Sequence, residues 1–333
     1  MGWPALTLHE ANMKFVAPAE TPKGLARRVP PAIFPAMMGL FGLGLAWRRA
    51  ADNFALPAGL AEASLGAITL LFLFALGAYA LKFARRPAVV LDDLKVLPGR
   101  LGLSAMIATI YLLASTLSLY FPDAARGLLL ATTAVHGMLI LAIGWVFLRG
   151  PAEQRRYSPA GHLYFVSPIV GGFVAAQAGY DFLALGLLGA SLIVAALIWA
   201  WGVDHLWRNG MAAPLRPLLA LHAAPAAVGG LGAQYLQMSG LAEVAAMIAA
   251  FVVALLVMRM RWITASGFSP LWGAFAFPLA ASASLWISLG GAWQMLGGVA
   301  LLAASIITVS VAYRIMKLWL SGQLAVRTNA AAA

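Results

Sequence analysis

The sequence predicts an all-α integral membrane protein in which ten transmembrane helices form five helical hairpins, arranged as a quasi-fivefold ring around a central pore. Three observations lead to this fold class: the composition, ten long apolar runs and the regular placement of proline. Of the 333 residues, 62% are hydrophobic and only 10% are charged, whereas soluble proteins carry about 25% charged residues. The lipid bilayer is therefore the first expected partner.

Ten apolar runs follow one another along the chain, and each has about the 20 residues that a membrane-spanning helix needs. They cover 31–47, 58–82, 101–121, 125–148, 162–179, 181–204, 214–236, 240–260, 269–291 and 293–319. Several connections contain only a few residues, so the helices on either side of them must be antiparallel neighbours. This pairing predicts the five hairpins.

The loop charges predict the orientation, because positively charged loops are retained in the cytoplasm. Of the 22 Lys and Arg residues, all but Arg48, Arg49 and Arg126 fall on the side of the two termini. We therefore expect a mobile cytoplasmic N-terminal tail (1–30), one transmembrane domain (31–320) and a cytoplasmic C-terminal tail (321–333).

Proline predicts which helices line the centre. A proline inside a helix removes a backbone hydrogen bond and bends the helix. Pro35, Pro168, Pro225 and Pro278 lie in the first, fifth, seventh and ninth runs, and no even-numbered run has an interior proline. Because neighbouring helices or a water-filled cavity satisfy the freed carbonyls best, the odd-numbered helices should form an inner ring. The third run lacks such a proline, but its Ser104 could face a polar path. Alternatively, the prolines merely shape helix packing.

The chain offers no catalytic or metal-binding motif, and it contains no cysteine. We expect neither enzymatic activity nor a cofactor or metal ion. The basic residues lie between apolar runs rather than in a stripe with aromatic residues, so no nucleic-acid partner is expected. Carboxylates are almost confined to loops. A path without mid-span carboxylates suits small anions better than cations.

Three ionisable residues within the runs are candidates for function. His222 in the seventh run and His136 in the fourth lie inside spans, where each is either functional or a neutral histidine hydrogen-bonded to a neighbouring helix. His222 is thus a candidate pore-lining residue. Glu62 lies near the end of the second run, where a structural ion pair with Arg48 or Arg49 is expected.

The ninth run carries one large ring on a surface of small residues. At helical spacing, Phe277 shares a face with Gly273, Ala281, Ser284 and Ser288. This geometry suits a plug in a narrow tube, with Ser284 and Ser288 as pore-lining candidates. Packing of the ring into a neighbouring helix is the alternative.

Two stretches resemble the tellurite-resistance/dicarboxylate transporter (TDT) family, which includes bacterial TehA and plant slow-type anion channels. They are Pro30-x-x-x-Phe34, Gly39-Leu40 and Leu45-Ala46-Trp47 in the first run, and Trp272 with Phe275-Ala276-Phe277-Pro278 in the ninth. The resemblance implies that Phe277 is the pore gate. It also implies a homotrimer with one pore per protomer, in the inner membrane of a bacterium. With the residue pattern, it makes Phe34 a further pore-lining candidate.

The leading functional hypothesis is an anion channel or channel-like transporter, with a pore lined by the first, third, fifth, seventh and ninth helices and occluded by Phe277. A first alternative keeps the fold and makes the protein a secondary carrier or exporter of sulfite, tellurite or C4-dicarboxylates. A second alternative is a non-conducting membrane scaffold or sensor.

Overall fold

The structure, a computed structural model, describes residues 26–151 and 158–333. Most of the predicted N-terminal tail, 1–30, therefore lies outside the described residues. Within them the chain forms helices and no strand, which confirms the all-α class. Seven described helices are long and apolar enough to cross a membrane. They are α2 (Gly59–Arg85), α4 (Leu97–Leu117), α5 (Pro122–Arg149), α7 (Asp181–Asn209), α9 (Ser239–Met258), α11 (Gly273–Leu289, together with the turn Pro270–Trp272 before it) and α12 (Gly291–Leu320).

The remaining three predicted runs are also helical, but each begins with a turn of different pitch. The α-helices are α1 (Phe34–Asn53), α6 (Pro168–Gln177) and α8 (Ala224–Tyr235), entered from η1 (Pro31–Ile33), η3 (His162–Val166) and η4 (Ala213–Ala223). A further turn, η5 (Pro270–Trp272), enters α11. The element η3 is a π-helix and the other three are 3-10 helices. The short helices α3 (Val89–Leu94), α10 (Met260–Ile263) and α13 (Gln323–Arg327) lie outside these runs.

The structure corrects the predicted position of three prolines within their helices. Pro35, Pro168 and Pro225 occupy the first turn of α1, α6 and α8 rather than a helix interior. A first-turn residue has no intrahelical partner for its N–H, so proline costs nothing there. Each α-helical segment therefore starts at its proline or one residue before it, and the change in pitch falls just ahead of that point. Pro278 lies inside α11.

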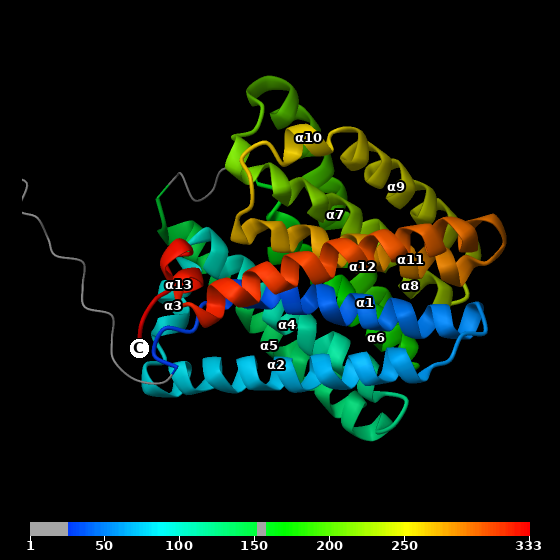
Figure 1. The fold of residues 1–333 in the computed structure, drawn as a ribbon, viewed down its shortest axis with the longest axis horizontal. Helices are drawn as coiled ribbons and strands as arrows, with labels where there is room; N and C mark the ends of the chain where they lie inside the picture. Colours follow the sequence, from blue (N-terminus) through cyan, green and yellow to red (C-terminus); the bar gives the residue numbers. More distant parts are fainter. Residues whose placement is uncertain (1–25, 152–157) are drawn as a thin grey trace, which may run out of the picture.

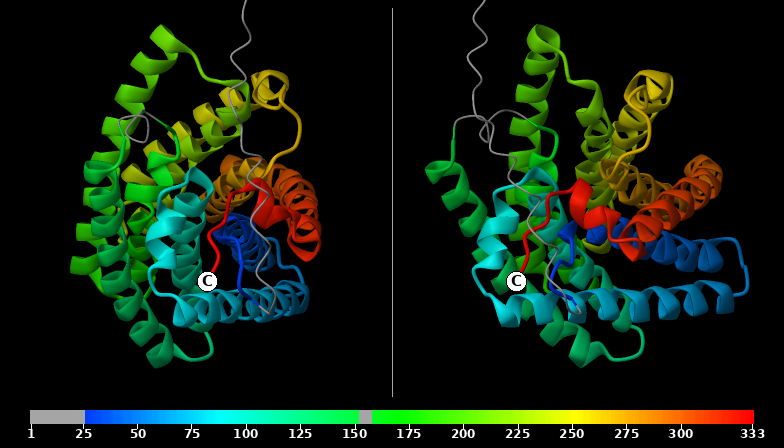
Figure 2. Two further views of the ribbon diagram at one scale, coloured as in Figure 1. Left: turned by 90° about the vertical axis from the view of Figure 1, so that its left-hand side faces the viewer. Right: turned by 60° about the vertical axis from the view of Figure 1, so that its left-hand side comes forward.

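Five helices contact one another in a closed cycle: α1 with α4, α4 with α6, α6 with α8, α8 with α11, and α11 with α1. Each of them also packs against the helix that follows it in the sequence, namely α2, α5, α7, α9 or α12. The long helices run along the longest axis of the molecule (Figure 1), and the end-on view shows the second set around the first (Figure 2, left).

Burial follows the same division. In the apolar windows of α2, α5, α7 and α9, only 22–28% of the residues are buried, against 83% in α4 and 78% in α11. Long apolar helices with so much exposed surface need lipid or another protein against them. The described helices therefore divide into an enclosed set and a peripheral set.

Two glycines allow α1 and α11 to lie close together. A Cβ atom added at Gly39 would overlap Ala276, and one added at Gly42 would lie 2.8 Å from Cδ2 of Phe277. Small residues of this kind let membrane helices approach each other closely. The Phe277 ring therefore packs directly against the backbone of α1.

A buried ion pair joins α2 to α3 near the described ends of the chain. Lys82 Nζ donates to Asp93 Oδ2 at 2.7 Å, and both side chains are fully buried. The Tyr79 hydroxyl donates to the same oxygen at 3.0 Å, and the Ala331 backbone N–H donates to Asp93 Oδ1 at 3.0 Å. The segment predicted as a C-terminal tail, 321–333, is thus tied to the helical domain.

Candidate functional site

Two cavities lie among the five cyclically arranged helices. The first, which we call the apolar cavity, has a volume of about 50 Å³ and is lined by residues near the beginning of each run, including Pro35, Leu101, His162, Leu218 and Leu271. The second, the polar cavity, has about 660 Å³ and is lined near the end of each run by residues including Arg48, Ser118, Gln177, Tyr235 and Ser284. All five helices therefore run in the same direction, as a repeat of helical hairpins requires.

The partition between the cavities is formed by three side chains. Val170, Val228 and Phe277 are the described residues that line both cavities. Phe277 is only 7% exposed, and its ring lies against Gly42. On α11, Gly273 lines the apolar cavity while Ala281 and Ser284 line the polar one. The ring thus stands between the two spaces on the face that the sequence predicts.

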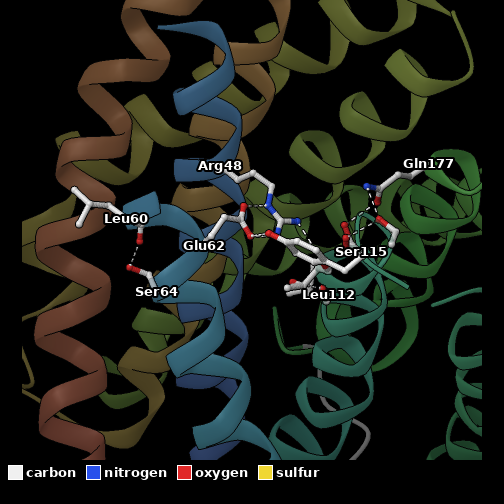
Figure 3. Close-up of polar contacts among 10 residues, drawn as sticks. Arg48, Leu60, Glu62, Ser64, Leu112, Ser115 and Gln177 are labelled. Atoms are coloured by element: carbon white, nitrogen blue, oxygen red, sulfur yellow. Dashed lines mark hydrogen bonds and ion pairs between the residues drawn. The ribbon is translucent and has the colours of Figure 1, made fainter. Parts of the chain in front are cut away.

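An ion pair forms part of the wall of the polar cavity (Figure 3). Arg48 donates from Nε to Glu62 Oε1 at 2.6 Å and from Nη2 to Oε2 at 2.7 Å, and its Nη1 donates to the Thr116 carbonyl at 3.4 Å. The Tyr120 hydroxyl also donates to Glu62, at 2.8 Å. Of the two arginines predicted as possible partners of Glu62, Arg48 therefore forms the ion pair.

Neutral polar groups line another side of the same cavity. Ser115 Oγ donates to Gln177 Oε1 at 2.7 Å, and Gln177 Nε2 donates to Ser118 Oγ at 3.3 Å (Figure 3). These groups join the ends of α4 and α6. The polar cavity therefore contains hydroxyl and amide dipoles as well as charges, which suits a hydrated ion.

The apolar cavity has only two polar side chains among its described lining residues, His162 and Ser167. His162 Nε2 lies 2.8 Å from His222 Nδ1, so one imidazole donates to the other. Ser167 Oγ donates to the Leu163 carbonyl at 2.7 Å and lies 3.0 Å from His136 Nε2. The predicted candidate His222 therefore does not line this cavity but contacts His162, which does. In the same way, His136 contacts the lining residue Ser167.

Three other predicted pore-lining residues are not among the described residues that line either cavity. Phe34 is fully buried and packs edge-on against two aromatic rings of α2. Ser104 is fully buried within α4. Ser288 donates from Oγ to the Leu285 carbonyl at 2.7 Å, one turn beyond Ser284. Of the predicted serines, the structure thus places Ser284 in a cavity wall.

Sequence reasoning did not find several residues that the structure brings into the site. Nothing in the sequence identifies Val170 and Val228 as cavity-lining residues, because an apolar side chain in an apolar helix can face a cavity, lipid or another helix equally well. His162 could have been found, since it begins the fifth run and is ionisable. Gln177 lies at the end of that run and resembles an ordinary loop residue.

The chain matches the family model described as SLAC1, voltage-dependent anion channel, over residues 28–316. A search of curated proteins gives no match. The matched range contains every described residue that lines the apolar and polar cavities. No group of three or more His, Cys, Asp or Glu within the described part of the chain could hold a metal ion.

Proposed function

Because the chain belongs to the SLAC1 family of voltage-dependent anion channels, the family predicted under its TDT name, we propose that its two cavities form one anion pore occluded by Phe277. Membership supports a general role in anion transport by a multi-pass membrane protein, in a family of channels and transporters rather than enzymes. One observation carries the finer proposal: the Phe277 ring is shared by both cavities and almost fully enclosed.

The proposed pore would work through two successive environments. In the polar cavity, hydroxyl and amide dipoles lower the cost of bringing an anion out of bulk water. At the partition, the ring and two valines offer almost no hydrogen bonds, so an ion that sheds water there gains little in return. The barrier would therefore depend on ion size and dehydration, and it would fall when the ring is removed.

The first test is Phe277→Ala in purified protein reconstituted into liposomes, measured as chloride and nitrate conductance. Loss of the ring should raise conductance roughly tenfold or more, since each factor of ten corresponds to about 1.4 kcal/mol of barrier. Phe275→Ala is the matched control. Phe275 is similarly buried on the same helix but packs with Leu219 and Ile263, away from the described cavity walls. Equal conductance of both variants and wild type would remove Phe277 from the gate.

The histidine pair favours a second candidate function, a proton-coupled carrier of sulfite, tellurite or C4-dicarboxylates. The contact of 2.8 Å between His162 and His222 places a titratable pair beside the apolar cavity, and intramembrane histidines are common in proton relays. A carrier should show saturable uptake driven by a pH gradient, with the pH dependence lost in His222→Asn. Uptake that ignores the gradient would favour the channel.

We propose that the termini face the cytoplasm of a bacterial inner membrane, so that the polar cavity opens to the outside. The loop charges support this orientation. Because the chain has no cysteine, single cysteines at the exposed positions Ala55 and Ser321 can be labelled from one side at a time. Only the Ala55→Cys variant should react with an impermeant reagent added outside.

The homotrimer is also a proposal, and it rests on the family resemblance. Light scattering of the purified protein in detergent gives the protein mass directly. A mass of one 35.0 kDa chain would contradict it.

If Phe277→Ala passed none of the small anions tested, the remaining hypothesis, a non-conducting scaffold or sensor, would gain support.

A further inference from the structure

Three arginines line the polar cavity, and two of them are paired with carboxylates. Arg48 makes two short bonds with Glu62 and a third contact with a backbone carbonyl. Arg126 pairs with Asp123 at 3.3 Å, at an exposed position. Each of these two cations therefore has a carboxylate as its ion-pair partner.

Arg49 lines the same cavity but has no carboxylate as an ion-pair partner among the described residues. Its Nη2 donates to the Tyr235 hydroxyl at 3.4 Å, and its guanidinium carbon lies 5.8 Å from the centre of that ring. No carboxylate of the described chain lies within ion-pair distance of it. Its Nε is enclosed by protein and has no hydrogen-bond acceptor. A guanidinium has five N–H donors. The enclosed Nε–H cannot reach an anion in the cavity, so the donors left for a ligand are those on the two Nη atoms that Tyr235 does not use.

The unused donors of Arg49 have a suitable neighbour. When Arg49 donates to the oxygen of Tyr235, the hydroxyl hydrogen of that tyrosine remains able to donate. Tyr235 is 38% exposed and lines the same cavity. A planar cation and a neutral O–H group from two different helices can therefore bind one small anion together, with charge-assisted hydrogen bonds.

The position of Arg49 relates it to the partition. Gly42 on the same helix packs against the Phe277 ring, and Arg49 follows Gly42 by seven residues, or two helical turns. This spacing corresponds to about 10 Å along α1. An anion bound by Arg49 would therefore lie within the polar cavity and would not contact the Phe277 ring.

We propose that Arg49 and the Tyr235 hydroxyl form a binding site for one small anion in the polar cavity, and that flat oxyanions such as nitrate bind there better than halides. The binding site lies within the proposed pore. Only its expected effect on conduction rests on the proposed function. The planar guanidinium fork accounts for the preference, because it can give two parallel hydrogen bonds to an oxyanion, whereas a halide is a single acceptor.

A binding measurement tests the site without any conduction. Nitrate should raise the melting temperature of the purified wild-type protein, because a ligand that binds only the folded state stabilises it. Arg49→Gln should abolish this shift, and Arg126→Gln, which removes another cavity arginine, should retain it. If Arg49→Gln lowers the melting temperature but keeps the nitrate shift, Arg49 has only a structural role and the proposal is overturned.

A conduction measurement then tests what the site contributes to flux. In the Phe277→Ala background, Arg49→Gln should raise the half-saturating nitrate concentration roughly tenfold, while Arg126→Gln leaves it unchanged. Arg49→Lys should keep chloride conduction and lose the preference for nitrate, since an ammonium lacks the fork. Equal values for the Gln variants in both assays would refute the site. If Phe277→Ala does not conduct but the nitrate shift depends on Arg49, the site stands and the pore proposal fails.

Discussion

The polar and apolar cavities are built from opposite ends of the same five helices, yet they differ in almost every physical property. The polar cavity is more than ten times larger and contains arginines, carboxylates, hydroxyls and an amide. The apolar cavity is lined by aliphatic side chains, apart from one histidine and one serine among its described residues. Only the Phe277 ring and two valines separate them.

Along the proposed path, the polar groups that attract an anion and the constriction that resists its passage therefore lie at different places. The parallel helices put their C-terminal ends, which carry partial negative charge, around the polar cavity, and Arg49, which makes no ion pair with a described carboxylate, opposes that charge there. The constriction holds no charge of its own, so it cannot trap an ion. A pore with a charged entrance and an uncharged gate attracts anions without retaining them.

The largest expected change in conductance is the re-closure of a channel opened by Phe277→Ala. Gly42 faces the ring across the α1–α11 contact, so a Leu side chain at this position would project into the space that the missing ring leaves. The double variant Gly42→Leu/Phe277→Ala should lose most of the roughly tenfold gain in anion conductance. Full conductance in the double variant would show that the path does not pass between these two residues.

The ion pairs at the two ends of α2 should differ in what they contribute to stability. Lys82 and Asp93 are fully buried, whereas Arg48 and Glu62 are 16% and 24% exposed. Asp93→Asn should reduce the free energy of unfolding by about 3–5 kcal/mol, because it leaves a buried charge without its partner. Glu62→Gln should cost no more than about 1 kcal/mol.

Denaturant titration in detergent measures both losses under the same conditions. Each replacement is isosteric and removes one negative charge, so each serves as the control for the other. Similar losses of stability for Asp93→Asn and Glu62→Gln would contradict the contrast in burial between the two pairs.

A smaller effect is expected on conduction when Arg48 loses its carboxylate. Glu62→Gln in the Phe277→Ala background leaves Arg48 as a second unopposed cation in the polar cavity. Anion conductance at low salt should rise by about twofold to fivefold, since charges near water interact with energies of about 1 kcal/mol. The increase should disappear at high salt, where the Debye length shortens. A decrease in conductance would show that Glu62 holds the entrance open.

The smallest effect is expected at Ser284, whose hydroxyl lies two turns beyond Phe277 in the polar cavity. Ser284→Ala removes a neutral dipole, but water and the other polar groups of this roomy cavity can replace it. Conductance in the Phe277→Ala background should change by less than about twofold. A change as large as that of Arg49→Gln would move the anion site towards α11.

Much of the fold could be predicted from the sequence, because hydrophobicity and proline act over whole helices. Each predicted run is helical, and the face of α11 that carries Phe277 follows directly from helical periodicity. The positions of Pro35, Pro168 and Pro225 in the first turn of a helix could not be predicted, because the change to a 3-10 or π turn before each proline has no recognisable sequence pattern.

The candidate site was less predictable. Phe34 resembled a pore-lining ring in the sequence, yet it packs against α2. Arg48 and Arg49 are adjacent and chemically identical, and nothing local says which one reaches Glu62. Side chains one residue apart on a helix point about 100° apart, so the position of α2 decides which of them is neutralised.

The sequence alone determined that this chain is a helical membrane protein, that its helices alternate between two roles, and that one phenylalanine stands on a face of small residues. These properties follow from local composition and helical spacing. Only the tertiary structure decided that Phe277 divides two unlike cavities, that His162 pairs with His222, and that Arg49 makes no ion pair with a described carboxylate. These relations join residues far apart in the sequence, and only helix packing determines which side chains meet.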